Sequence, residues 1–179
     1  MFHIALLRGI NVGGHKKVAM ADLRDLATRL GFKNVRTILQ SGNLVFDATT
    51  TSASRLERVL EDAAAKRLGL QIAFFVRGAA DWAATIADNP FPREAERDPS
   101  HLLVMFLKDE PEAKDVKALQ ASITGPELVR ARGRQAYFVF PAGMGTSRVT
   151  TALIERKLGT AGTGRNWNTV LKLGALAAL

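Results

Sequence analysis

The sequence contains no cysteine, which excludes disulfide bonds and thiol chemistry and suits a reducing cytoplasm. It also has no apolar run near the ~18 residues that a membrane span needs. The first residues lack the basic region and the small-residue cleavage site of a secretory signal peptide. We therefore expect a cytoplasmic protein with no membrane partner.

Histidine is scarce, and the three that occur, His3, His15 and His101, are not at the spacing of metal ligands. No pair of carboxylates stands out, and the Gly-x-Ser-x-Gly elbow of serine hydrolases is missing. The sequence therefore predicts no metal and no cofactor, and it leaves open whether the protein is an enzyme.

The sequence does have an ordinary apolar content and an excess of cations. Hydrophobic residues make up 47% and charged residues 23% of the chain, so we expect a folded core rather than disorder. The net charge is +8 and the pI is near 10.3. Such a surface attracts polyanions. The excess is divided evenly between the two halves, however, without a basic tail that would favour nucleic acid more strongly.

Hydrophobic periodicity predicts the order strand, helix, strand, strand, helix, strand in the first half. The predicted strands are 2–7, 35–40, 43–46 and 72–76, and the predicted helices are 20–30 and 54–68. A capping box beginning at Ser54 opens the second of these helices. A further helix over 79–87 leads to the turn 89–92, whose two prolines prevent it from continuing.

The second half repeats this order. The predicted strands are 102–107, 127–132, 135–140 and 160–167. One helix has Pro111 in its first turn, a second is capped by Thr146 or Ser147 and ends at Gly159, and a last helix follows. We therefore predict an α+β protein of two tandem ferredoxin-like (βαββαβ) subdomains, 1–90 and 95–179, related by internal duplication.

The predicted strands also indicate that the sheets are covered. Both faces of 2–7 and of 102–107 are apolar, which is typical of strands buried on both sides. The segment after Arg132-Gly133 matches an aromatic RNA-recognition strand only weakly, because one required aromatic is missing. Phe138 and Phe140 alternate as core residues do. We expect core strands here rather than an open RNA-binding sheet.

The most unusual stretch is the loop after the first strand, Arg8-Gly9-Ile10-Asn11-Val12-Gly13-Gly14-His15-Lys16-Lys17. Its glycines permit positive φ and close approach of a ligand to the backbone. Consecutive N–H groups in such a loop can form an anion-binding nest. The predicted ligand-binding residues of this loop are Arg8, Gly9, Asn11, Gly13, Gly14 and Lys16, with Lys17 adding charge.

The residues of this loop are compatible with a plainer interpretation and resemble one further motif. The loop can be a wide turn whose lysines are solvated, since glycine first of all marks turns. A P-loop is disfavoured although the strand–loop–helix context is right, because His15 separates the last glycine from a lysine and Lys17 replaces the Ser or Thr that would bind Mg²⁺.

Topology adds a second segment to the candidate site. In a ferredoxin-like sheet the first two strands run in the same direction, so their C-terminal ends share one edge. The loop after Leu7 is therefore expected beside the hairpin that holds Ser41, Gly42 and Asn43, which we include among the ligand-binding residues. A catalytic role for Ser41 is disfavoured, because a serine in a hairpin turn usually bonds to its own backbone.

A third unusual stretch is Gly164-Arg165-Asn166-Trp167-Asn168-Thr169. In the structural interpretation, Asn166 or Asn168 caps the last helix and Trp167 anchors it in the core. In the functional interpretation, Arg165, Asn166 and Trp167 line a polar cleft and contact the ligand. The sequence does not choose between them.

Taken together, these stretches resemble a bacterial family, domain-of-unknown-function family 1697 (DUF1697). The resemblance is carried by 6–14, by 35–37 with 40–43, by the turn 89–92 and by 165–170, and it extends over essentially the whole chain. The resemblance implies an α+β fold of two similar ferredoxin-like subdomains. It also implies that these stretches are important in the family, but it indicates no activity.

Three functions are compatible with the sequence. The first is binding of a phosphate-bearing ligand, either nucleic acid or a nucleotide-like metabolite, at the glycine loop. The second is an enzyme that uses the same cleft, with Arg8 as electrophile and His15 or Ser41 in acid–base work. The third is a module that dimerises through an exposed strand edge. The oligomeric state stays open.

Overall fold

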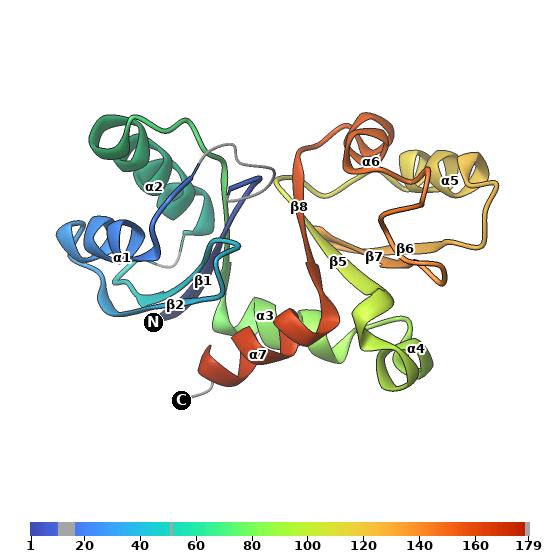
Figure 1. The fold of residues 1–179 in the computed structure, drawn as a ribbon, viewed down its shortest axis with the longest axis horizontal. Coiled ribbons are helices and arrows are strands. Elements are labelled where there is room, and N and C mark those ends of the chain that lie inside the picture. The colour runs from blue at the N-terminus through green and yellow to red at the C-terminus, as the bar shows by residue number, and fades with distance from the viewer. Residues whose placement is uncertain (11–16, 51, 178–179) are drawn as a thin grey trace. The chain divides into compact units, whose positions relative to one another are not determined.

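The computed structural model describes residues 1–10, 17–50 and 52–177. In these residues the chain forms two four-stranded antiparallel sheets, seven α-helices and one short 3₁₀ helix, arranged as two similar halves (Figure 1). Its contacts define two compact units, Met1–Ala84 with Lys172–Leu179, and Thr85–Leu171. The predicted subdomain boundaries stay a prediction, because a division by contacts does not test where one repeat ends.

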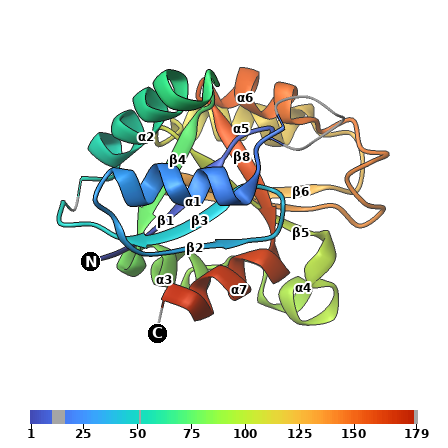
Figure 2. The same ribbon diagram turned by 60° about the vertical axis from the view of Figure 1, so that its left-hand side comes forward.

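The first half contains a sheet with the strand order β2-β3-β1-β4, in which all neighbours are antiparallel. Two helices, α1 and α2, cover one face of this sheet (Figures 1 and 2). Its elements are β1 (Phe2–Leu7), α1 (Met20–Arg29), β2 (Lys33–Ile38), β3 (Asn43–Asp47), α2 (Ala53–Leu68) and β4 (Phe74–Gly78), followed by α3 (Ala79–Ala87).

The second half contains a sheet with the equivalent order, β6-β7-β5-β8, again antiparallel throughout. The helices α5 and α6 pack on one of its faces. Its elements are α4 (Pro92–Arg97), the 3₁₀ helix η1 (Pro99–His101), β5 (Leu102–Leu107), α5 (Ala113–Ser122), β6 (Leu128–Arg132), β7 (Gln135–Val139), α6 (Thr151–Leu158), β8 (Gly162–Asn166) and α7 (Trp167–Ala177).

The central strands are buried on both faces, as their apolar sequences predict. In β1, Ala5 and Leu7 face the helices, while Ile4 and Leu6 on the opposite face are also fully buried. All six residues of β5 are buried in the same way. Phe138 and Phe140 lie in the core with stacked rings 5.9 Å apart, so the prediction that they are core residues is confirmed.

Each half forms the same backbone hydrogen bonds at equivalent positions, in addition to having the same order of elements. Leu7 N–H donates to the Gly42 carbonyl at 2.9 Å, and Leu107 N–H donates to the Arg134 carbonyl at 2.9 Å. The next residue of each strand repeats the pattern, since Arg8 N–H donates to Ala73 and Lys108 N–H donates to Ala161. The similarity of the halves therefore extends to single backbone contacts.

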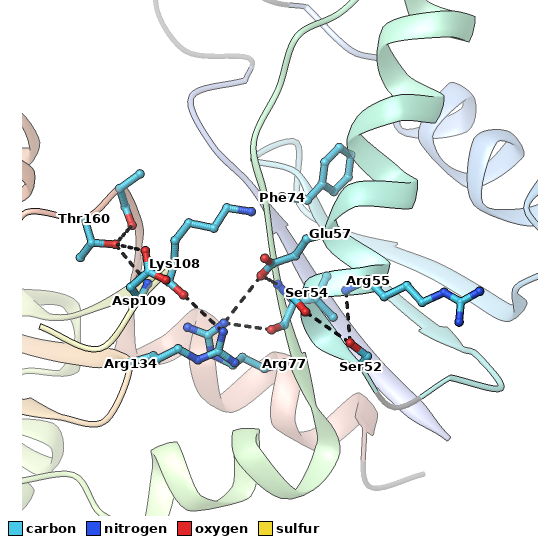
Figure 3. A network of polar contacts seen from close by, with 12 residues as sticks. Ser52, Ser54, Arg55, Glu57, Phe74, Arg77, Lys108, Asp109, Arg134 and Thr160 are labelled. Carbon is cyan, nitrogen blue, oxygen red and sulfur yellow. Dashed lines mark hydrogen bonds and ion pairs between the residues drawn. The ribbon is translucent and has the colours of Figure 1, made fainter.

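Three predicted helix starts are wrong. The N-cap of α2 is Ser52, whose hydroxyl accepts from Arg55 N–H, so Ser54 lies inside the helix (Figure 3). The N-cap of α6 is Thr150 rather than Thr146 or Ser147. Pro111 precedes α5, which begins after Glu112. Ser and Thr are plentiful around both caps, and the sequence alone does not show which hydroxyl meets a free N–H.

Other boundaries differ by a few residues. The predicted strand 35–40 begins two residues later than β2, and the predicted strand 72–76 begins two residues earlier than β4. The helix α4 was not predicted from the sequence. There the turn 89–92 stops α3, as expected, but Pro92 is also the first residue of α4. Proline fits the first helical turn because it needs no N–H partner there.

The single tyrosine of the chain provides a pH test of the second core. Burial raises the pKa of Tyr137 to about 12, and its hydroxyl donates to the Thr85 carbonyl at 2.7 Å. Because the folded state holds the proton more tightly than the unfolded state, this group's contribution to stability is complete below pH 10 and is lost between about pH 10 and 12. Tyrosinate absorbance should titrate near pH 12. A reversible titration near 10 in the folded protein would contradict this burial.

Candidate functional site

The end of β1 and the β2–β3 hairpin lie together, as the topology predicts. Leu7 N–H donates to the Gly42 carbonyl. Ile10 packs over the same glycine, because a Cβ built on Gly42 would come within 2.9 Å of Ile10 Cγ1 and of Leu7 Cβ. A glycine is required at this point for the two segments to approach so closely. The prediction that the two segments converge is confirmed.

On the β1 side, the described residues form a basic and accessible edge. Arg8 is half-buried and its N–H is held by the Ala73 carbonyl at 3.1 Å. Gly9 is exposed with φ +62°, and a built Cβ there would meet nothing within 4 Å. Lys17 is exposed. Four predicted ligand-binding residues, Asn11, Gly13, Gly14 and Lys16, lie outside the described residues.

On the hairpin side, the Asn43 side chain stabilises the β2–β3 turn by hydrogen bonds. Asn43 is fully buried, and its Nδ2 donates to the Ile38 carbonyl at 2.9 Å and to Ser41 Oγ at 3.0 Å. Ser41 is exposed. The Asn43 carboxamide therefore sets the shape of the turn, whereas Ser41 and the backbone around Gly42 are the accessible groups.

The third predicted group belongs to the second unit, where its residues have structural partners. Arg165 is buried and its Nη1 donates to Thr163 Oγ1 at 2.9 Å and to the Gly164 carbonyl at 2.8 Å. Burial lowers the pKa of Arg165 to about 10, so the side chain stays charged at neutral pH. Asn166 Oδ1 accepts from Thr169 N–H at 3.0 Å and caps α7, and Trp167 is buried. These contacts agree with the structural interpretation of this stretch.

Sequence reasoning missed the counterpart of Arg165 in the first half. Arg77 is the fourth residue of β4 and pairs with Ile4, the third residue of β1. Arg165 is the fourth residue of β8 and pairs with Val104, the third residue of β5. Each Nη1 donates to the carbonyl of the preceding residue. No local signal in the sequence marks this correspondence, because Arg77 lies outside the predicted strand 72–76 and β4 in fact spans Phe74–Gly78.

The edge equivalent to the glycine loop is also polar in the second half. Arg134 Nη1 donates to the Lys108 carbonyl at 3.4 Å, and Asp109 N–H donates to Thr160 Oγ1 at 3.1 Å (Figure 3). Thr160 in turn contacts Asp109 Oδ2 at 3.5 Å. The polar groups at this edge are thus engaged with one another and fix the ends of β5 and β8.

A cluster beside β5 has the residue types of a hydrolase but not their arrangement. Asp98 accepts from Ser100 Oγ at 2.8 Å and contacts His101 Nδ1 at 2.5 Å. The Ser100 hydrogen bond, followed by the one to His101, lowers the pKa of Asp98. A serine nucleophile must bond to the histidine, and here it bonds to the carboxylate. The cluster fixes η1 rather than forming a catalytic relay.

The described residues contain neither a cluster of metal ligands nor a membrane-spanning helix. No group of three or more His, Asp or Glu side chains that could hold a metal ion occurs in 1–10, 17–50 and 52–177. Among the helices of that part of the chain, none has the length and the apolar character needed to cross a membrane.

Comparison with known proteins gives a family and a structural relative. The solved structure of the conserved bacterial protein SP0830 from Streptococcus pneumoniae is similar, with a TM-score of 0.74 and 25% sequence identity over 98% of each chain. No curated protein matches the sequence. Residues 1–137 match the model of a family described as "Protein of unknown function (DUF1697)". Since that match spans most of the chain, the protein belongs to the DUF1697 family.

Proposed function

We propose that this protein binds a phosphate-bearing ligand, either a nucleic acid or a nucleotide-like metabolite, at the C-terminal end of β1 beside the β2–β3 hairpin. The observation that carries the proposal is the convergence of these two segments through the Leu7–Gly42 hydrogen bond. It joins two backbone-exposing polar loops that are more than thirty residues apart in sequence. Loops that meet at strand ends on a rigid sheet are frequent places for binding.

The chemistry of the described residues suits an anion. Gly9 has positive φ and no atom within 4 Å of a built Cβ, so a ligand can approach its backbone. Arg8 and Lys17 supply positive charge on one side, and the exposed Ser41 supplies a hydroxyl on the other. The net charge of +8 favours encounter with polyanions. An anion is the ligand that backbone N–H groups and cations together bind best.

We also propose that each half is a ferredoxin-like subdomain and that the chain arose by internal duplication. The equivalent strand orders support this, as do the matching hydrogen bonds at the ends of β1 and β5. The positions of Arg77 and Arg165 add a third correspondence. We further propose a cytoplasmic location, which a cysteine-free chain suits.

Fluorescence anisotropy with labelled single-stranded RNA and duplex DNA tests the proposed ligand class. The variant Arg8→Ala/Lys16→Ala/Lys17→Ala should bind about tenfold or more weakly at low salt, because each lost cation no longer contacts phosphate. The slope of log affinity against log salt should fall by up to about 3. Competition by nucleotides and inorganic phosphate distinguishes a small ligand from a polymer.

A charge-matched variant separates this site from net charge alone. Arg29, Lys66 and Arg67 are exposed cations of α1 and α2, and replacing all three with alanine removes the same charge. That control should bind like the wild type. Equal losses in both variants would assign binding to the overall charge, and no binding of RNA, DNA, nucleotide or phosphate would end the proposal.

A further inference from the structure

The outer edge of β6 differs from the outer edge of β4. β6 is the last strand of its sheet and pairs only with β7 in the order β6-β7-β5-β8. The Val129 carbonyl faces away from β7, since it accepts from Gln120 Nε2 of α5 at 3.0 Å. Backbone direction alternates along an antiparallel strand. Ala131, two residues further on, therefore directs its N–H and its carbonyl to the same outer side.

Two hollows follow this edge, one at each end of β6. The larger has a volume of about 580 Å³ and lies between α5 and the end of β6, where Pro111, Val116 and Ala131 give it apolar walls. The smaller, of about 230 Å³, is lined by Phe91, Ile123 and Val129 among others. Gln120 and Arg130 line both hollows. The hollows are therefore adjacent and together form a groove along the strand.

The rim of this groove is cationic. Lys117, Arg130 and Arg132 are exposed and line the larger hollow, so that three cations stand against two acidic residues, Glu110 in the larger hollow and Glu127 in the smaller. The Arg130 guanidinium lies 5.2 Å from the centre of the Phe91 ring, which orients it by a cation–π contact. Arg132 Nη1 donates to the Ala131 carbonyl at 3.4 Å, so this carbonyl already accepts one hydrogen bond at the outer edge. The charge of the rim favours an acidic ligand.

The edge of β4 shows what a covered strand edge looks like in this protein. Glu57 and Glu61 of α2 point at it, and their carboxylates accept from Val76 N–H and Phe74 N–H, each at 2.9 Å. A carboxylate against a strand edge blocks the pairing of another chain. At β6 the neighbouring helix instead supplies an amide to one carbonyl, and the groove leaves room beside the rest of the edge.

We propose that the edge of β6 binds an extended peptide with acidic side chains, which adds to the sheet as a fifth strand. Main-chain hydrogen bonds to Ala131 supply part of the affinity, and alternate side chains supply specificity. With a period of two, apolar side chains enter the hollows while acidic ones reach Arg130, Arg132 and Lys117. The phosphates of a nucleic acid offer acceptors to this rim but no donor, whereas a peptide backbone supplies both a donor and an acceptor to a strand edge, so a peptide fits better. This site is separate from the glycine loop.

The test is a fluorescence-anisotropy titration of the full chain with a labelled peptide of alternating glutamate and valine. Wild type should bind it, and Arg130→Glu/Arg132→Glu should weaken binding by about tenfold or more, since both rim charges are reversed. Peptide N-methylated on the residues that face β6 should also bind about tenfold more weakly, because it lacks the N–H donors. This second change leaves the protein untouched, so misfolding cannot explain it.

The remaining outcomes overturn the proposal. A lysine–valine peptide that binds equally well removes the charge argument, and an N-methylated peptide that binds equally well removes the added strand. Ala131→Pro deletes the outward N–H without disturbing the pairing with β7. Self-association that this variant abolishes would assign the edge to a second copy. RNA binding lost in the arginine variant alone would assign the rim to nucleic acid, and no peptide binding at millimolar concentration would reject the site.

Discussion

Glu57→Ala is expected to be the most destabilising single substitution considered for this protein. Glu57 is 5% and Arg77 1% exposed, and the Glu57 carboxylate lies 4.0 Å from Arg77 Nη1 while accepting from Val76 N–H at 2.9 Å (Figure 3). Removing one partner of a buried pair leaves the other charge poorly compensated, which costs about 3–5 kcal/mol. The melting temperature should fall by about 10 °C.

Two variants divide this effect into its parts. Glu57→Gln keeps an oxygen for Val76 N–H but removes the charge beside Arg77, so it should destabilise less than alanine. Glu61→Ala removes the hydrogen bond to Phe74 N–H in a partly buried setting, at about 1–2 kcal/mol. Urea unfolding of the three variants measures the differences. A Glu57→Ala protein within 1 kcal/mol of wild type, on the scale of surface changes, would contradict the account of this edge.

Gly42→Ala is the second large expected effect, and it acts at the candidate site. The new Cβ would lie 2.5 Å from Ile10 Cδ1 and 2.9 Å from Leu7 Cβ, and the backbone at Gly42 has φ +76°. Left-handed backbone costs a residue with a side chain about 1–2 kcal/mol, and overpacking adds about 1–3 kcal/mol. We expect a loss of about 2–5 kcal/mol in the free energy of unfolding, measured by urea denaturation.

Gly159→Ala is the matched control for this substitution. Gly159 ends α6 with φ +67°, and a built Cβ there meets nothing within 4 Å. It carries the backbone cost without the overlap, so about 1–2 kcal/mol is expected. Equal losses at Gly42 and Gly159 would show that the β1 loop and the hairpin are not packed as closely as the structure indicates.

The sequence predicted the order of elements because apolar periodicity is strong in the strands and helices. The run from Leu102 to Leu107 became β5 with the predicted bounds. The prediction of helix starts from the sequence failed where several neighbouring residues could act as the N-cap. Ser52 and Ser54 are both good N-caps, but Ser52 is the one used, and the Glu57 carboxylate bonds to the edge of β4 instead of completing a capping box at Ser54. That bond depends on tertiary contacts absent from the local pattern.

The candidate site was predictable in position more than in detail. Topology alone placed the end of β1 beside the hairpin, since it follows from strand direction. The inward orientation of Asn43 could not be deduced, because a hairpin asparagine can equally face solvent. Arg77 was missed because its role appears only when β4 and β8 are aligned by their pairing partners.

The measurement that tests the central claim most directly is a two-dimensional amide NMR titration with RNA and, separately, with a nucleotide. The account predicts that the largest shifts occur at Gly9, Ser41 and Gly42. Arg8→Ala/Lys16→Ala/Lys17→Ala should reduce those shifts. Shifts concentrated elsewhere, or none with any phosphate-bearing ligand, would contradict the assignment of anion binding to the glycine loop.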